Sequence, residues 1–253
     1  MAFSSPATNL VENDTNGRTD VFVHERQTAT QPDDCIAPTT TATAITTSGG
    51  PYETGAWTNE DVKVTFSAQD EGGSGTKDIR YSASGDQSIP ETVYDEQDPP
   101  VINTEGTTSI SYFATDNAGN EESPAKTFEV KIDRTPPSVS STSPPNNATG
   151  VAATAAISAI FSESGSGIDP DSLTSETLPT DTFKVVQVKP TGNVTVPGTV
   201  GYEEGLQTAT FTPSSSLAKG AYRATLTTDI ADEAGNVMPD YTWQFATAGP
   251  PKR

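Results

Sequence analysis

The chain has 253 residues, of which 34 are acidic and 14 are basic, and its formal net charge at pH 7 is −20. A surface this acidic repels phosphate backbones, so the composition excludes a nucleic-acid-binding protein. Cys35 and His24 are the only residues of their types. A single cysteine excludes an intrachain disulfide and a cysteine-based metal cluster. Catalysis by a nucleophile and a histidine base would have to rest on His24 alone. We therefore expect no enzyme activity, and no run of roughly 18 apolar residues predicts membrane insertion.

Residues 1–34 form a short leader. Two strand-like runs, Met1–Ser5 and Asp20–His24, flank a turn at Asp14–Gly17. The phrases AFSS, TNLV, DTNG and DVFV, followed by Arg26-Gln27-Thr28, resemble one blade of the TolB-like, WD40-like bacterial propeller repeats. A propeller closes with about four to eight blades. We therefore expect a hairpin remnant or a disordered tail here, and we expect that the natural polypeptide or its ancestor continued upstream.

Residues 35–136 form the first predicted module. In Val62–Gln69 apolar residues alternate with polar ones, which is the period of a strand with one buried face. No stretch of this module shows sustained helical periodicity. Turn clusters rich in Gly, Asp and Pro separate further strand candidates, which are Thr39–Thr43, Ile79–Ala83, Ile110–Ala114 and Phe128–Ile132. Short alternating strands at this spacing are typical of a β-sandwich.

The same module carries a family resemblance. The phrases TNEDV, FSAQD, GSG, IRYS, TEG, SYFATD and KIDRTPP, in this order, resemble a family of bacterial Ig-like repeats found in outer-membrane and secreted surface proteins. The resemblance spans the full module. It departs over Gly85–Val101, where an acidic, Pro-rich segment replaces the usual aromatic-containing hairpin. The resemblance implies an Ig-like sandwich at the surface of a cell or in the extracellular space.

Residues 137–248 form the second predicted module, and residues 249–253 are a tail. The strand candidates are Ile157–Glu163, Phe183–Val188, Val194–Val200, Ala209–Phe211, Tyr222–Leu226 and Tyr241–Thr247. The phrases SPPNNATGV, ISAIFSE, ATFTPSSSLAKGAYRATL, DEAGN and YTWQF resemble the bacterial Ig-like domain of S-layer and other surface proteins. This sequence departs from that family after Glu163, where Ser164–Gly167 replaces a Met-Asp pair and predicts a longer loop.

One phrase occurs in both modules. Asp116-Asn-Ala-Gly-Asn120 returns as Asp232-Glu-Ala-Gly-Asn236, each time before the final predicted strand. One interpretation is a hairpin cap, in which the Asp carboxylate accepts backbone N–H groups and the Gly takes a positive φ. The other is a Ca²⁺ site, because Ca²⁺ binds six to eight hard oxygen ligands. For the first module the additional acidic ligands would be Asp70, Glu71 and Asp133. No cofactor is required by either interpretation.

The sequence thus predicts an all-β chain with two Ig-like β-sandwich domains in tandem after a short N-terminal hairpin remnant. We expect an extracellular or cell-surface module that spaces or presents neighbouring domains of a longer polypeptide. Loops at the sandwich ends or an exposed sheet edge would bind a partner, such as a surface protein or a glycan. The alternatives are an accessory region of a secreted multidomain enzyme and a propeller-associated binding module.

Overall fold

The computed structural model describes residues 2–5, 20–23, 34–174 and 182–248. In the leader, β1 (Ala2–Ser5) pairs antiparallel with β2 (Asp20–Val23), and Ala2 lies opposite Val23. The predicted turn at Asp14–Gly17 and the phrase Arg26–Thr28 lie outside the described residues. The resemblance to a propeller blade stays a prediction.

The first sandwich consists of two facing sheets built from the strands between Thr39 and Ile132. One sheet has the strand order β5-β11-β10-β7-β8, and the other has the order β4-β3-β6-β9. The strands are β3 (Thr39–Thr46), β4 (Pro51–Tyr52), β5 (Trp57–Thr58), β6 (Val62–Gln69), β7 (Thr76–Gly85), β8 (Ile89–Val93), β9 (Val101–Ile102), β10 (Gly106–Asp116) and β11 (Lys126–Ile132).

The core of this sandwich follows from the two-residue period of its strands. On β6, Val62, Val64 and Phe66 are buried while their neighbours face outward. Ile110 and Tyr112 of β10 face them from the other sheet, and the ring centroids of Phe66 and Tyr112 lie 4.9 Å apart. The segment Gly85–Val101, where the family resemblance departs, contains β8, which extends the sheet beyond β7.

The second sandwich is built in the same way from the strands between Ser138 and Thr247. Its sheets have the orders β12-β14-β18-β17 and β13-β20-β19-β15-β16. The strands are β12 (Ser138–Ser143), β13 (Ala148–Val151), β14 (Ile157–Ser162), β15 (Phe183–Val188), β16 (Val194–Thr195), β17 (Gly198–Glu203), β18 (Thr208–Pro213), β19 (Gly220–Leu226) and β20 (Tyr241–Thr247), with short 3-10 turns η1 (Pro170–Ser172) and η2 (Glu204–Leu206).

One predicted strand of this module is wrong. Val194–Val200 was expected to be continuous, but β16 ends at Thr195 and pairs with β15, while β17 begins at Gly198 and pairs with β18 in the opposite sheet. Pro197 lies between them and lacks the N–H that a continuous ladder needs. The chain therefore changes sheets at this proline.

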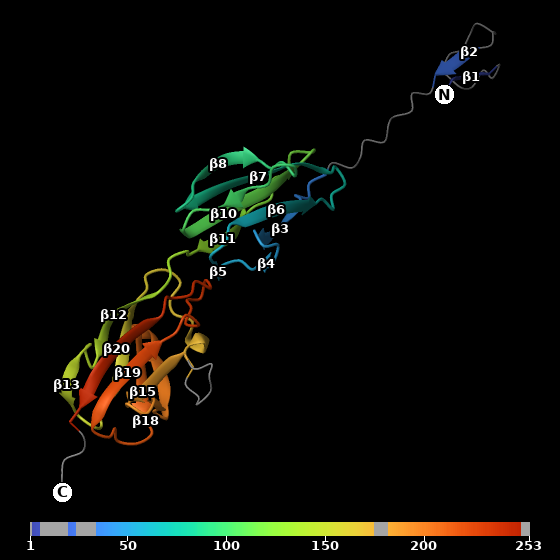
Figure 1. Cartoon of the computed structure of the whole chain (residues 1–253). Helices are drawn as coiled ribbons and strands as arrows, with labels where there is room; N and C mark the ends of the chain where they lie inside the picture. Colours follow the sequence, from blue (N-terminus) through green and yellow to red (C-terminus); the bar gives the residue numbers. More distant parts are fainter. Residues whose placement is uncertain (1, 6–19, 24–33, 175–181, 249–253) are drawn as a thin grey trace.

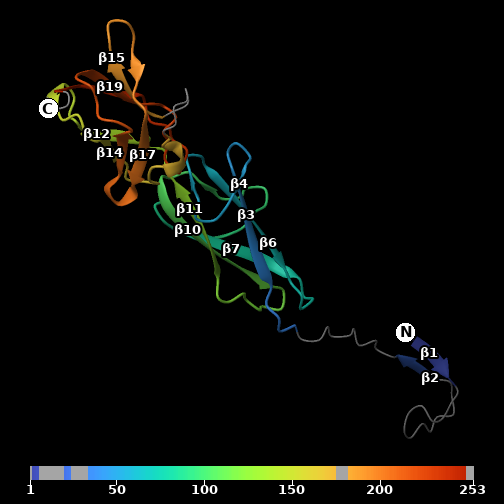
Figure 2. The same ribbon diagram turned by 90° about the horizontal axis from the view of Figure 1, so that it is seen from below.

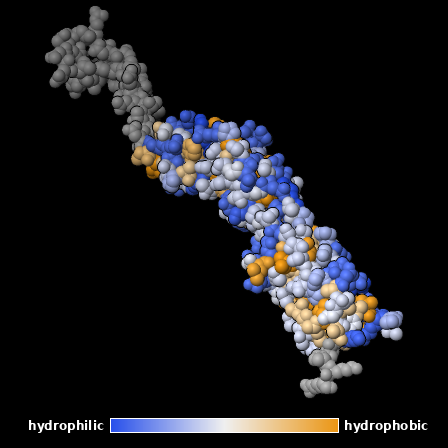
Figure 3. Space-filling model, turned by 90° about the vertical axis from the view of Figure 1, so that its left-hand side faces the viewer, coloured by the Kyte–Doolittle hydropathy of each residue, from blue (hydrophilic) through white to orange (hydrophobic). Residues whose placement is uncertain are grey.

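The two sandwiches lie end to end, as the views in Figure 1 and Figure 2 agree. Because β10 and β11 are antiparallel, with Gly106 opposite Ile132, the Asp116 turn and the residues after Ile132 lie at opposite ends of the first sandwich. Figure 3 shows the face of the described modules as predominantly hydrophilic, with separate apolar spots. Scattered single apolar residues are ordinary for a protein surface.

Candidate functional site

Each sandwich contains the same hydrogen-bonded turn before its last strand. The Asp116 N–H donates to the Asn120 carbonyl (3.1 Å), and the Asn120 N–H donates to Asp116 Oδ1 (2.8 Å). In the second module the Asp232 N–H donates to the Asn236 carbonyl (3.0 Å), and the Asn236 N–H donates to Asp232 Oδ1 (2.8 Å). The glycine of each turn has a positive φ, +94° and +88°. The predicted hairpin cap is confirmed in both modules.

The asparagine of each turn also holds the chain that leads into its module. Asn120 Nδ2 donates to Asp116 Oδ2 (2.7 Å) and to the carbonyl of Asp34 (2.9 Å). Asn236 Nδ2 donates to Asp232 Oδ2 (2.8 Å) and to the carbonyl of Asp133 (2.8 Å). We call these groups linker clamps: the first is Asp34, Asp116 and Asn120, and the second is Asp133, Asp232 and Asn236.

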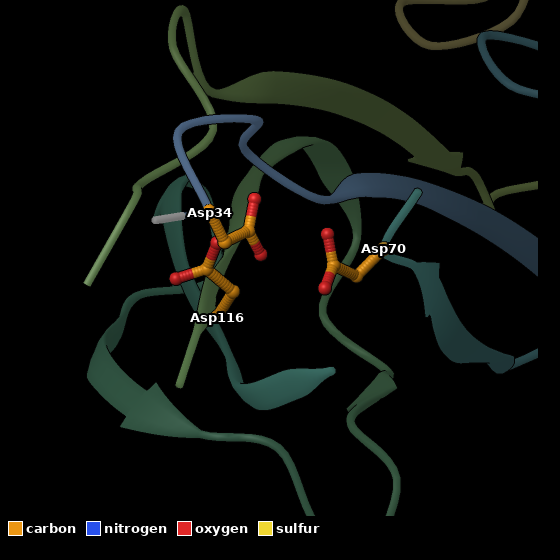
Figure 4. Close-up of side chains that lie close together, drawn as sticks. All are labelled: Asp34, Asp70 and Asp116. Carbon is orange, nitrogen blue, oxygen red and sulfur yellow. The ribbon is translucent and has the colours of Figure 1, made fainter. Parts of the chain in front are cut away.

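A third carboxylate joins the first clamp. Asp34, Asp70 and Asp116 each place a carboxylate oxygen within 4.8 Å of the others, and their positions are shown in Figure 4. A Cβ at Gly72 would lie 1.8 Å from Asp34 Oδ1, which is far too close. The loop after β6 can therefore approach Asp34 only because residue 72 is glycine. All six oxygens of this first cluster accept hydrogen bonds from the protein, donated by Ile36, Gly72, Ser74, Gly75 and Asn120.

The second clamp is joined by Glu163, which directly follows β14. One oxygen each of Asp133, Glu163 and Asp232 lies within 4.8 Å of the others, and these residues are only 4%, 9% and 2% exposed. Ser166 donates to Asp133 Oδ2 through its N–H (2.7 Å) and its hydroxyl (2.8 Å). The Gly165 N–H donates to Glu163 Oε1 (2.7 Å). Glu163 Oε2 is buried and has no hydrogen-bond partner among the described residues.

The pKa of Glu163 shifts in the opposite direction from the pKa values of Asp116 and Asp34. Burial raises the pKa of the Glu163 carboxyl, and the negative charges of Asp133 and Asp232 act in the same direction. Burial also acts to raise the pKa of Asp116, but hydrogen bonds from Asn120 outweigh it, and that pKa lies below its ordinary value. The hydrogen bond from Ser74 is the main cause of the lowered pKa of Asp34. The surroundings of Glu163 therefore disfavour its ionised form, whereas those of Asp116 and Asp34 favour it.

The structure regroups the predicted calcium ligands. Asp70 and Asp116 meet in the first cluster, whereas Asp133 and Asp232 meet in the second. Glu71 is exposed and belongs to neither cluster of the described residues. The expectation that Asp133 lies with Asp70 is wrong, because β11 runs from the Asp116 end to the other end of the sandwich. Its seven residues cover about 23 Å at the rise of a strand.

Two members of the clusters, Asp34 and Glu163, were missed by the sequence reasoning. Asp34 and Asp133 each lie five positions before the first strand of their module, β3 and β12. Asp70 and Glu163 each follow directly on a strand and begin a loop of Gly and Ser. Aligning the two modules at these equivalent positions could thus have identified Asp34 and Glu163 as members of the clusters.

The linker between the modules, residues 133–137, is also held by the first module. The Asp133 N–H donates to the Thr58 carbonyl (3.0 Å). The Arg134 N–H donates to Glu105 Oε1 (2.6 Å), and Arg134 Nη1 donates to the Asn103 carbonyl (2.9 Å). The guanidinium of Arg134 also pairs with the Asp61 carboxylate. The linker therefore has hydrogen-bond partners in both modules.

The comparisons with known proteins agree with this architecture. The sequence model of a bacterial Ig-like domain matches residues 133–247. This match includes the Asp133 of the linker and all strands of the second sandwich. No curated protein sequence matches the chain.

Several solved structures are similar in outline. Dimeric latent PorU from Porphyromonas gingivalis shares 14% identity with a TM-score of 0.31, covering 85% of this chain and 25% of that chain. An I-band fragment of titin shares 10% identity with a TM-score of 0.38, covering 83% and 65%. Fibronectin(III)-like modules of CbhA from Clostridium thermocellum share 13% identity with a TM-score of 0.33, covering 81% and 93%. The chain thus spans a quarter of the PorU chain and just under two thirds of the titin fragment.

The predicted fold class, all-β with Ig-like sandwiches, is confirmed by the strand topology and by the family match over residues 133–247. Domains of this family are generally non-catalytic structural modules. Within the part of the chain that the structure describes, no helix has the length and apolar character needed to cross a membrane.

Proposed function

We propose that the chain is a non-catalytic spacer of an extracellular or cell-surface protein, which holds neighbouring parts of a longer polypeptide at a fixed separation. The observation that carries this proposal is the linker that both modules hold. A flexible tether would leave its polar backbone groups to solvent. Here the N–H of Asp133 bonds to the first module and its carbonyl bonds to the second.

The chemistry of the linker supports the same function. Pro136 and Pro137 restrict the backbone immediately after Arg134 and Thr135. Arg134 makes its three described contacts to the first module, through Glu105, Asn103 and Asp61. A planar guanidinium that binds a carbonyl and a carboxylate fixes both its position and its orientation. Binding of a surface protein or a glycan through the end loops stays a prediction.

The proposal is tested by measuring the distance between the modules with paired spin labels. In a Cys35→Ser background, Ile45→Cys in β3 and Val188→Cys in β15 offer exposed positions, 39% and 41% accessible, one in each module. We expect one narrow distance distribution, which Arg134→Ala broadens. Arg80→Ala is the matched control, because Arg80 pairs with Asp78 and Glu91 inside the first module. A broad distribution in the unmutated background refutes a rigid spacer.

A further inference from the structure

We propose that Asp133, Glu163 and Asp232 bind a calcium ion where the linker meets the second module. This inference stands on the geometry of the cluster and does not depend on the spacer function. All three carboxylates are at least nine-tenths buried, and they converge within 4.8 Å. Their described hydrogen-bond donors are N–H and hydroxyl groups of Thr135, Gly165, Ser166 and Asn236, none of which carries a charge.

The unpartnered oxygen of Glu163 is the observation that indicates a bound cation. Glu163 Oε2 is inaccessible to solvent and accepts no hydrogen bond among the described residues, although Oε1 of the same carboxylate is paired. Buried polar groups are almost always paired, and an orphaned charged oxygen is costly. Arg134, the nearest cation in the sequence, turns to Asp61 of the first module. A bound cation would satisfy the orphaned oxygen and offset the repulsion among the three carboxylates.

The donor set and its burial favour Ca²⁺. The three side chains offer hard carboxylate oxygens, and Ca²⁺ binds such oxygens at about 2.3–2.6 Å. Two ligand oxygens of one Ca²⁺ can be up to about 5 Å apart, so three oxygens that all lie within 4.8 Å of one another can share one ion. Mg²⁺ demands a distance of about 2.0–2.1 Å and releases its water reluctantly. A buried cluster, from which water is largely excluded, thus suits Ca²⁺ better than Mg²⁺.

The first cluster is an internal comparison for the second. Asp70 occupies the place of Glu163, and both of its oxygens accept hydrogen bonds, from Gly72 and from Gly75. Glutamate is one methylene longer than aspartate, and its second oxygen in the second cluster has no such partner. The two clusters therefore share their framework, and the orphaned oxygen distinguishes the one that we assign to the ion.

An ion in this position would tie three separate parts of the chain together. Asp133 belongs to the linker, Glu163 begins the loop after β14, and Asp232 belongs to the turn before β20. Binding of an ion to the folded state alone stabilises that state by mass action. The second module is therefore the part of the chain whose melting temperature Ca²⁺ raises.

The test uses the full chain, stripped with EDTA and titrated with CaCl₂ by calorimetry, with MgCl₂ as a comparison. We expect Ca²⁺ binding and a rise of about 10 °C in the melting temperature of the second module at a hundredfold excess over Kd. Glu163→Gln keeps the shape of the side chain, and we expect it to weaken Ca²⁺ binding at least about tenfold. In EDTA the same variant should melt above the unmutated chain, because it removes one of three repelling charges. Asp70→Asn in the first cluster is the matched control and should leave this binding unchanged.

The amide resonances of the unmutated chain locate the ion without any variant. We expect Ca²⁺ to shift the N–H signals of Gly165, Ser166 and Asn236. The proposal is overturned if Ca²⁺ causes neither heat nor a change in melting temperature. It is also overturned if only the signals of Gly72 and Ser74 shift, or if Glu163→Gln binds Ca²⁺ as tightly as the unmutated chain.

Discussion

Replacing Asn236 by alanine is the most direct test of the second linker clamp. The side chain is 9% exposed, and its Nδ2 donates to Asp232 Oδ2 and to the Asp133 carbonyl, each at 2.8 Å. A hydrogen bond to a charged acceptor contributes about 1.5–3 kcal/mol, and one to a neutral acceptor about 0.5–1.5 kcal/mol. Both acceptors belong to buried residues, so in the variant water cannot readily replace the two lost hydrogen bonds. We expect the second module to lose about 3 kcal/mol, or about 10 °C in melting temperature.

The assay is denaturant unfolding in EDTA, followed by the fluorescence of Trp243 in a Trp57→Phe background. Trp243 is 1% exposed in the core of the second module, so its emission reports that module alone. Asn193→Ala is the matched control, because Asn193 is exposed in the turn between β15 and β16 and its loss should change stability by less than about 0.5 kcal/mol. A loss below about 1 kcal/mol in Asn236→Ala, or one equal to the control, refutes the clamp as a stabilising contact.

Two further predictions concern the first module. Burial acts to raise the pKa of Glu122, but hydrogen bonds from Thr40 and Lys126 outweigh it, and the folded-state pKa lies below the ordinary value of 4.5. The ionised carboxylate therefore stabilises the fold fully above that value, and this contribution is lost as the pH falls through the lower folded-state pKa. Thermal melts from about pH 3 to pH 7 should show a fall in melting temperature at acid pH, and Glu122→Gln should make this fall smaller. Identical pH profiles for the variant and the unmutated chain would contradict this. Ile110→Ala empties a fully buried position and should cost the first module about 2–5 kcal/mol, while the unfolding reported by Trp243 stays unchanged; a joint shift of both transitions would show that the modules do not unfold independently.

The strands were predictable because one face of each is buried. Alternation at Val62–Gln69 and the apolar run Phe183–Val188 match β6 and β15 in both bounds. The change of sheet at Pro197 was not predicted, because two short valine-rich runs have the same local pattern whether or not they pair with the same sheet. Local periodicity specifies a strand but not its neighbour.

The acidic clusters could be predicted only in part. The repeated turn marked Asp116 and Asp232, and its capping geometry follows from the residue types alone. Which other acids join each turn depends on the direction of β11, which carries Asp133 away from Asp70. The orphaned oxygen of Glu163 depends on one methylene and on where the loop after β14 places its N–H groups. The position of one carboxylate oxygen relative to nearby N–H groups is set by the packing of the folded chain and cannot be predicted from the local sequence.

The linker clamps also define the shortest route for tension through the chain. The first clamp connects Asp34 to Asn120, a few residues before β11, and β11 leads to Asp133. The second connects Asp133 to Asn236, a few residues before β20, which leads to the end of the second sandwich. A pulling force can thus pass to the last strand of each module through the asparagine amide, and in the first module also through the bonds of Thr40 to Glu122 and Lys126. When a clamp breaks, the load passes instead through the first strand of its module, β3 or β12, and through the sheet to which that strand belongs.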